Sequence, residues 1–347
     1  MLYIPIIKLK KTEIIKAQYF NKYLHHENII PFLELRYSLN EQAKNCNLND
    51  FLQITKLSTF FLGIPHKKSA IRINGSSKED NYLVQANKNA KAYYEEATNL
   101  FVVKNAVPVF YVYSDNDLIY LNEFISYARD SDRRIGIIAT PRLAKSFKDN
   151  GVELSMSDYL FIDLEDKSIV SQRVNLEEIT RNTRCKIILI RENRSLWTNN
   201  TSLEDEKQSP MLNDLSTEFD EINKRKIRII IHGFGDYCGQ KNDISTSGGG
   251  NKQEKYPATA LYIKEDKPHY FYTVKSDIPI FDGFADLKTK TIAKMDIIDR
   301  NNVTQAKDIL NNLSMKTYSY WHILEETCYL AKMYHYDDWK TIVVKNF

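Results

Sequence analysis

The stretch that decides the fold runs from residue 107 to residue 163, where short apolar segments alternate with helical ones. The segments are, in order, VPVFYVY (107–113), NDLIYLNEFISYA (116–128), IGIIA (135–139), PRLAKSF (141–147) and YLFID (159–163). The segments 107–113, 135–139 and 159–163 are apolar on both faces, which is typical of parallel strands covered by helices. Ser114 and Asp115 precede the first helical segment as a possible N-cap pair, and Pro141 suits the first turn of the second. The stretch therefore predicts strands that alternate with helices.

Similar apolar runs lie on both sides of this stretch, at 3–7, 29–35, 70–73, 187–191 and 227–232. Helical patterns separate several of them, at 12–24, 48–61 and 83–102. Eight strands alternating with helices predict an α/β fold of the (β/α)8, TIM-barrel-like kind. The rival is an open doubly wound sheet, which normally has a glycine-rich turn after its first strand. Here the first strand is followed by Lys8-Leu9-Lys10-Lys11, so the barrel is favoured.

The later part of the chain departs from this alternation. Residues 198–209 are polar and predict an insertion, and residues 243–254 (DISTSGGGNKQE) predict a flexible loop. The segments 258–263 and 270–274 flank a charged turn and predict a β-hairpin insertion over 258–274. Residues 303–334 predict extra C-terminal helices, at 303–313 and 318–334. We expect residues 1–347 to form a single barrel-like domain.

Composition limits the class of protein. The chain has 48 basic and 45 acidic residues, a net charge of +3, so its charge gives no indication of nucleic-acid binding. The four cysteines lie far apart without a CxxC pair, and the first residues do not resemble a secretory signal. No apolar run approaches the roughly 18–20 residues that a membrane span needs. These features predict a cytoplasmic protein with reduced thiols and no membrane partner.

The active site of such a barrel lies at the carboxyl ends of its strands. The residues at the predicted strand ends are ionisable, and we take Asp236, His232, Glu34 and Asp163 as catalytic candidates and Lys8, Lys10, Arg36, Arg72, Arg191 and Tyr237 as ligand-binding candidates. Lysine and arginine there would neutralise an anionic ligand such as a phosphate ester. The carboxylates could hold Mg²⁺ or act as acid and base, as in a metal-assisted phosphoester hydrolase. The alternative is that strand ends meet solvent and are charged for that reason alone.

The segment HGFGDY (232–237) is the strongest local signal. It begins a cluster of six of the chain's eleven glycines, which all fall between residues 233 and 250. Two glycines at a strand end permit positive φ or a close approach of the backbone to a ligand. His232 and Asp236 could then form a pair for proton transfer. The alternative is a tight turn that needs glycine, with His232 hydrogen-bonded at the rim.

Both ends of the chain resemble one protein family. The motifs are Tyr3-x-Pro5-x-x-Lys8 with Glu13, IIPFLEL (29–35), GFGDY (233–237), Pro257-Ala258, His269-Tyr270-Phe271 and Ser276-Asp277. They resemble the beta-protein family, which is named for a phage beta protein and whose bacterial members often sit in mobile phage-defence gene neighbourhoods. Residues 69–223 match only in strand rhythm. The resemblance implies an intracellular, barrel-like protein of antiviral defence of the abortive-infection type, and it implies no catalytic residues.

Two hypotheses for the function follow. In the first, the strand-end mouth of the barrel binds an anionic ligand such as a phosphate-containing molecule, with or without hydrolysis. In the second, the chain is a non-catalytic sensor or scaffold that docks a phage protein or a toxic effector. The docking surface would then be the C-terminal hairpin and the aromatic helices, which include Trp321 and Trp339.

Overall fold

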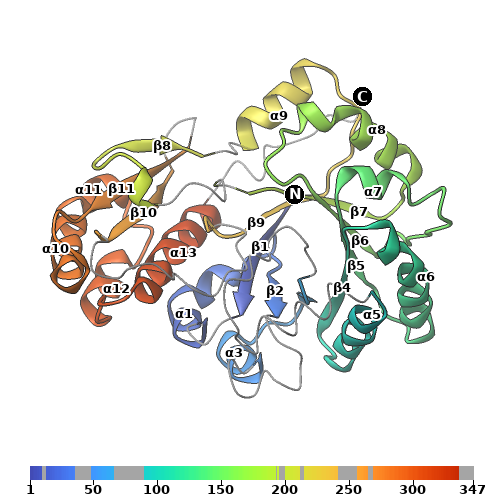
Figure 1. Ribbon diagram of the computed structural model, residues 1–347, viewed down its shortest axis with the longest axis horizontal. Coiled ribbons are helices and arrows are strands. Elements are labelled where there is room, and N and C mark those ends of the chain that lie inside the picture. Colours follow the sequence, from blue (N-terminus) through green and yellow to red (C-terminus); the bar gives the residue numbers. More distant parts are fainter. Residues whose placement is uncertain are drawn as a thin grey trace.

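The chain folds around a closed barrel of eight parallel strands with helices outside it (Figure 1). The computed structural model describes residues 1–9, 13–35, 48–65, 90–192, 194, 200–211, 215–240, 256–264 and 269–335. The barrel strands, in order around the ring, are β1 (Leu2–Leu9), β2 (Phe32–Leu35), β3 (Phe60–Gly63), β4 (Ala106–Val112), β5 (Gly136–Ala139), β6 (Tyr159–Asp163), β7 (Lys186–Ile190) and β9 (Gly233–Asp236). The predicted TIM-barrel-like α/β fold is thus confirmed.

Helices connect successive strands and cover the outside of the barrel. They are α1 (Glu13–Phe20), α3 (Leu48–Thr55), α5 (Ala90–Asn99), α6 (Asp115–Asp130), α7 (Pro141–Lys145), α8 (Arg173–Asn182) and α9 (Leu215–Lys224). Short 3₁₀ turns add η1 (Asn21–Leu24), η3 (Leu100–Val102) and η4 (Val170–Gln172). The start of α6 shows how the sequence sets these helices. Ser114 and Asp117 form a capping box there, which satisfies backbone N–H groups that the first turn leaves open.

Aromatic side chains fill the inside of the barrel. The ring centroids of Phe61 lie 4.9 Å from those of Phe161 and 4.7 Å from those of Tyr159. Phe32 lies 5.5 Å from Phe161 by the same measure. Because side chains along a strand alternate between its two faces, these rings also fix which residues point inward further along each strand. The interior is therefore a packed core of aromatic rings.

The last barrel strand differs from the prediction. Residues 227–232 form no strand, and β9 pairs with β1 and β7 in their place. A Cβ atom at Gly233 would lie 2.6 Å from Cδ1 of Ile188 and 2.8 Å from the carbonyl oxygen of Leu2. Glycine is needed here because the strand packs tightly inside the barrel, and not because the chain turns.

Replacing Gly233 by alanine is expected to lower the free energy of unfolding by about 1–3 kcal/mol, because the added methyl group overpacks the barrel. Urea denaturation followed by circular dichroism measures this loss. An unchanged midpoint would show that β1 and β7 leave room for a side chain at this position.

The third strand also differs from the prediction. The predicted strand at 70–73 lies outside the described residues. Strand β3 instead begins at Phe60, inside the end of the segment predicted as a helix over 48–61, and continues to Gly63. Helix α3 ends at Thr55, and Lys56 follows with a φ of 50°, the left-handed conformation that ends many helices. The apolar run at 60–62 then begins the strand. The helical spacing of the apolar residues before it concealed this change.

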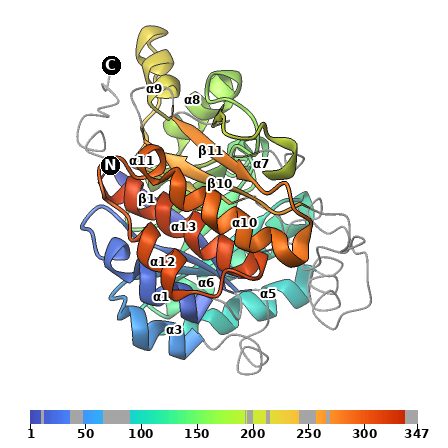
Figure 2. The same ribbon diagram turned by 90° about the vertical axis from the view of Figure 1, so that its left-hand side faces the viewer.

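A second layer covers one side of the barrel (Figure 2). It holds a three-stranded antiparallel sheet of β10 (Ala258–Ile263), β11 (Tyr270–Lys275) and β8 (Gln208–Pro210). Its helices are α10 (Ile280–Ala293), α11 (Met295–Ile298), α12 (Ala306–Asn312) and α13 (Tyr318–Tyr334). The strands of the predicted hairpin pair as expected, and β8 extends them from the segment predicted as an insertion. The predicted loop at 243–254 lies outside the described residues.

Helix α13 lies between this sheet and the barrel. Its Trp321, Leu324 and Cys328 belong to the core under the sheet, whereas Tyr329 and Leu330 belong to the core of the barrel. Trp321 is 1% exposed and its indole N–H donates to the carbonyl of Met315 at 3.0 Å. It therefore offers no docking surface, contrary to the scaffold hypothesis, and Trp339 lies outside the described residues. Within the described ranges, no helix has both the length and the apolar character that crossing a bilayer requires.

Candidate functional site

The carboxyl ends of the barrel strands bring together a set of polar side chains, which we call the mouth cluster. Each member follows an inward-facing residue by two or four positions, so strand alternation directs it into the mouth. The cluster consists of Lys8 of β1, Glu34 of β2, Tyr111 and Tyr113 at the end of β4, Asp163 of β6, Glu192 after β7 and Tyr237 after β9. Four of the predicted candidates, Lys8, Glu34, Asp163 and Tyr237, thus lie in one place.

Two tyrosine–carboxylate pairs form the centre of the mouth cluster. The Tyr111 hydroxyl donates to Oε1 of Glu34 at 2.6 Å, and the Tyr113 hydroxyl donates to Oδ2 of Asp163 at 2.6 Å. The backbone N–H of Glu165 donates to Oδ1 of Asp163 at 3.0 Å. Glu34 is 2% exposed and Asp163 is fully buried. A buried carboxylate needs such donors, because burial without them would cost several kcal/mol.

The tyrosines of the mouth cluster are held in their protonated form. Burial, and then the negative charge of Glu34, raise the pKa of Tyr111 well above its ordinary value. Burial and the charge of Asp163 do the same to the pKa of Tyr113. The phenols therefore remain hydrogen-bond donors at neutral pH. Each pair combines a proton acceptor with a proton donor, the two groups that general acid–base chemistry uses.

Tyr237 lies among the charges of the mouth. It is 2% exposed, and burial followed by the charges of Glu34, Asp163, Glu192 and Glu165 raises its pKa well above the ordinary value. The Lys8 ammonium lies 4.9 Å from the centre of its ring, which is a cation–π distance. Carboxylates thus outnumber ammonium groups around this phenol among the described residues.

Asp236 lies elsewhere, although it neighbours Tyr237. Gly235 and Tyr237 face the barrel interior, so the side chain of Asp236 points outward toward α13. It is fully buried there, where the Tyr3 hydroxyl donates to Oδ1 at 2.9 Å and the Tyr329 hydroxyl donates to Oδ2 at 2.6 Å. The Cys238 N–H also donates to Oδ1, at 2.9 Å. Asp236 therefore joins the barrel to α13 and is not part of the mouth cluster.

His232 lies at the opposite end of the barrel from the mouth. It precedes β9, and its Nδ1 accepts a hydrogen bond from the N–H of Ile187, near the start of β7, at 3.1 Å. Burial, and then the charge of Lys186, lower the pKa of the His232 imidazole. Three residues lie between it and Asp236, so the two are four steps apart, about 13 Å along the strand at roughly 3.3 Å per residue. The predicted pairing of His232 with Asp236 is not formed.

The predicted basic residues of the site do not all lie together. Arg191 is 5% exposed and forms an ion pair with Glu218 of α9, outside the barrel interior. Glu218 also accepts from the N–H of Ile169 at 3.1 Å, so this pair ties α9 to the barrel. Lys10, Arg36 and Arg72 lie outside the described residues. Of the two predicted basic residues that the structure describes, Lys8 lies in the mouth cluster and Arg191 does not.

A metal site is a separate question. In the ranges that the structure describes, no group of three or more histidine, cysteine, aspartate or glutamate side chains is arranged to hold a metal ion. We derive no step through a metal.

The sequence-based prediction missed Tyr111. The signal was available, because Tyr111 and Tyr113 lie two residues apart in one strand and therefore share a face. An inward tyrosine followed by a second one at the strand end marks a polar lining that enters the barrel.

No protein-family model matches the sequence, and no curated protein matches it. The resemblance of the two ends to the beta-protein family therefore stays a prediction.

Proposed function

We propose that the protein acts in antiviral defence, and that its mouth cluster binds a small anionic ligand which also carries hydroxyl groups, such as a nucleotide or a sugar phosphate. The resemblance of both chain ends to the beta-protein family supports the role in defence. The observation that carries the binding site is the convergence of Lys8, Glu34, Asp163 and Tyr237 at one end of the barrel, with each carboxylate already held by a tyrosine.

The charges of the mouth cluster orient this ligand. An anionic group would lie beside Lys8, because the carboxylates of Glu34 and Asp163 repel negative charge. Hydroxyl groups of the ligand would donate to these carboxylates, as ribose hydroxyls do to acidic residues in other nucleotide sites. A ligand with several phosphates in a row would fit less well, since carboxylates outnumber ammonium groups around Tyr237 among the described residues.

Binding can be tested with Glu34→Gln, Asp163→Asn and Lys8→Met. Isothermal titration calorimetry with AMP and with a sugar monophosphate should show binding to the unchanged protein. We expect each variant to bind at least about tenfold more weakly, which corresponds to the loss of one charge-assisted hydrogen bond. Glu178→Gln, on the outer helix α8, is the control and should leave binding unchanged. Equal affinity for the three variants and the control would refute the site.

The role in defence needs its own measurement. Cells that express the chain should resist phage infection in a plaque assay, and cells that express Glu34→Gln or Asp163→Asn should lose that resistance. Full resistance with variants that no longer bind would separate defence from the mouth cluster. Absence of any resistance with the unchanged chain would refute the defensive role.

A further inference from the structure

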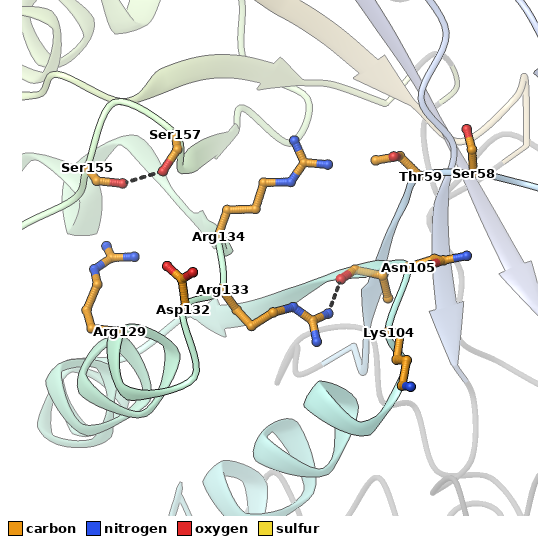
Figure 3. Close-up of a pocket in the computed structure, with 11 residues that line it drawn as sticks. Ser58, Thr59, Lys104, Asn105, Arg129, Asp132, Arg133, Arg134, Ser155 and Ser157 are labelled. Carbon is orange, nitrogen blue, oxygen red and sulfur yellow. Dashed lines mark hydrogen bonds between the residues drawn. The ribbon is translucent and has the colours of Figure 1, made fainter.

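A hollow lies at the end of the barrel opposite to the mouth cluster, and Figure 3 shows its lining. Its volume is about 570 Å³, within the range of pockets that hold small molecules. The lining comes from the turns that directly precede four successive strands, and we call it the amino-end hollow. These residues are Ser58 and Thr59 before β3, Lys104 and Asn105 before β4, Arg133 and Arg134 before β5, and Ser155 and Ser157 before β6, with Ala106, Arg129 and Asp132 beside them.

The amino-end hollow is basic. Three of its cations, Lys104, Arg133 and Arg134, form no ion pair with any residue in the described ranges. Asp132 is the acidic residue of the lining, so the unneutralised charge is positive. Lys104 and Arg134 are exposed and can reach a ligand. In Figure 3, Arg134 extends between the Ser155–Ser157 turn and Thr59.

Two of the guanidinium groups are fixed in advance. Arg133 donates to the carbonyl groups of Phe101, Val103 and Ala106 at 3.1, 3.0 and 2.6 Å. Since its partners are neutral, it keeps its charge while losing its freedom to move. Arg129 forms a two-pronged ion pair with the buried Asp158. Groups that are ordered before a ligand arrives lose less entropy on binding.

Hydroxyl groups complete the polar lining. The Ser155 and Ser157 hydroxyls lie 2.8 Å apart, and Asp158 accepts from both the N–H and the hydroxyl of Ser155 at 2.8 Å. These bonds hold the turn before β6 in one conformation. Arginine, lysine and hydroxyl donors around one hollow are the groups that bind phosphate oxygens.

A less polar hollow of about 520 Å³ adjoins the basic one. Its lining includes Leu52, Leu57, Phe60 and Val103. It shares Ser58, Lys104 and Asn105 with the amino-end hollow, so the two lie side by side. A ligand that spans both would carry an anionic group at one end and a less polar group at the other.

We propose that the amino-end hollow binds an organic phosphate of mononucleotide size, with its phosphate among Lys104, Arg133 and Arg134 and its less polar part against Leu52 and Val103. This site is separate from the mouth cluster, because the two lie at opposite ends of the barrel strands. It would let the protein respond to a second small molecule. The shallow, open shape favours a free metabolite over a substrate that must be shielded from water.

The test uses the full chain and the double variant Lys104→Ala/Arg134→Ala. Both side chains are exposed and lack ion-pair partners among the described residues, so the variant should keep the melting temperature of the unchanged protein. The double variant and its control both carry Lys8→Met, so that AMP bound at the mouth cluster does not mask the amino-end hollow. In this background, isothermal titration calorimetry with AMP should show an affinity that falls at least about tenfold when Lys104 and Arg134 are replaced, since two charge-assisted contacts are lost. Inorganic phosphate should bind more weakly than AMP, because it leaves the less polar hollow empty.

The control removes the same two charges from α9 and the residue after it, with Lys224→Ala/Arg225→Ala. Both control side chains are exposed and pair only with Glu221 among the contacts described, so AMP binding should not change. The Lys8→Met variant distinguishes the two sites, because it affects the mouth cluster and leaves the amino-end hollow intact. Equal AMP affinity for the double variant and the control refutes the proposal, and so does binding of a single-stranded oligonucleotide that AMP does not displace.

Discussion

Replacing Asp236 by alanine is expected to lower the free energy of unfolding by about 3–5 kcal/mol, the usual cost of breaking a buried, hydrogen-bonded charge. The substitution leaves the Tyr3 hydroxyl, the Tyr329 hydroxyl and the Cys238 N–H without their acceptor in a fully buried place. Asp236→Asn should cost less, because its amide oxygen still accepts and its NH₂ group can donate to one phenol oxygen. Chemical denaturation followed by circular dichroism measures all three proteins.

The control for this prediction is Asp130→Ala, at the exposed end of α6. A loss for Asp236→Ala no larger than for Asp130→Ala would contradict the structural role. The same variants address the catalytic role that the sequence suggested for Asp236. A folded Asp236→Asn protein should bind ligands at the mouth cluster as the unchanged protein does, because its side chain lies on the other face of β9.

Replacing Glu325 by alanine should cost about 3 kcal/mol or more, because this carboxylate on α13 is a buried acceptor for several elements. Its Oε1 accepts from the Asn200 amide at 2.8 Å, the Thr259 hydroxyl at 3.0 Å and the Ala260 N–H at 3.1 Å. Its Oε2 accepts from the Gln240 amide at 3.0 Å and lies 3.1 Å from Nδ1 of His322. Without Glu325, the second layer loses its main polar link to the residues that follow β9.

Glu325 also makes the stability of the protein depend on pH. Burial by itself raises the pKa of this carboxyl, but the hydrogen bond and charge of His322, the charge of Arg194 and the hydrogen bond of Gln240 together lower it to about 2 from an ordinary 4.5. The folded protein therefore holds this proton more weakly than the unfolded chain. The resulting stabilisation is present above pH 4.5 and is lost as the pH falls from 4.5 toward 2, to a total of about 3 kcal/mol.

Measuring the free energy of unfolding at pH 6 and at pH 3 checks this sign. The unchanged protein should lose more stability between the two values than Glu325→Gln, which has no proton to bind at this site. Glu153→Gln, in an exposed loop, is the control and should follow the unchanged protein. An equal loss for Glu325→Gln and the control would show that other carboxylates cause the acid sensitivity.

The fold could be predicted where strands are buried on both faces, because such strands are continuously apolar in the sequence. Strands β4, β5 and β6 are buried on both faces, so their apolar runs stand out from the amphipathic helices between them. Helix α13 has the bounds that the sequence predicted. Strand β3 was missed because α3 ends only a few residues before it. Strand β9 was missed because its glycines resemble a turn, and only the position of Ile188 on the neighbouring strand shows why they are needed.

The site was predictable only in part, for a related reason. Glu34 and Asp163 lie at the carboxyl ends of apolar strands. A barrel brings the carboxyl ends of its strands together whatever the sequence that connects the strands. The contrast between Asp236 and Tyr237 depends on which face of β9 points inward, so an error of one residue exchanges the interior for the exterior. The sequence also gave no reason to consider the opposite end of the barrel, where turns before four strands meet at one hollow.

The contacts of Asp236 have a consequence for how the protein is made. This carboxylate accepts from one residue 233 positions earlier in the chain and from another 93 positions later. During synthesis on the ribosome, β1 can therefore pair with β9 and close the barrel only after β9 has been made. The hydrogen bond from Tyr329 to Asp236 can form only after α13 has been made. Contacts so distant in sequence slow folding. During most of its synthesis, a nascent chain would therefore have an unpaired strand edge on its open barrel. Chaperones would be most needed in this interval to cover that edge.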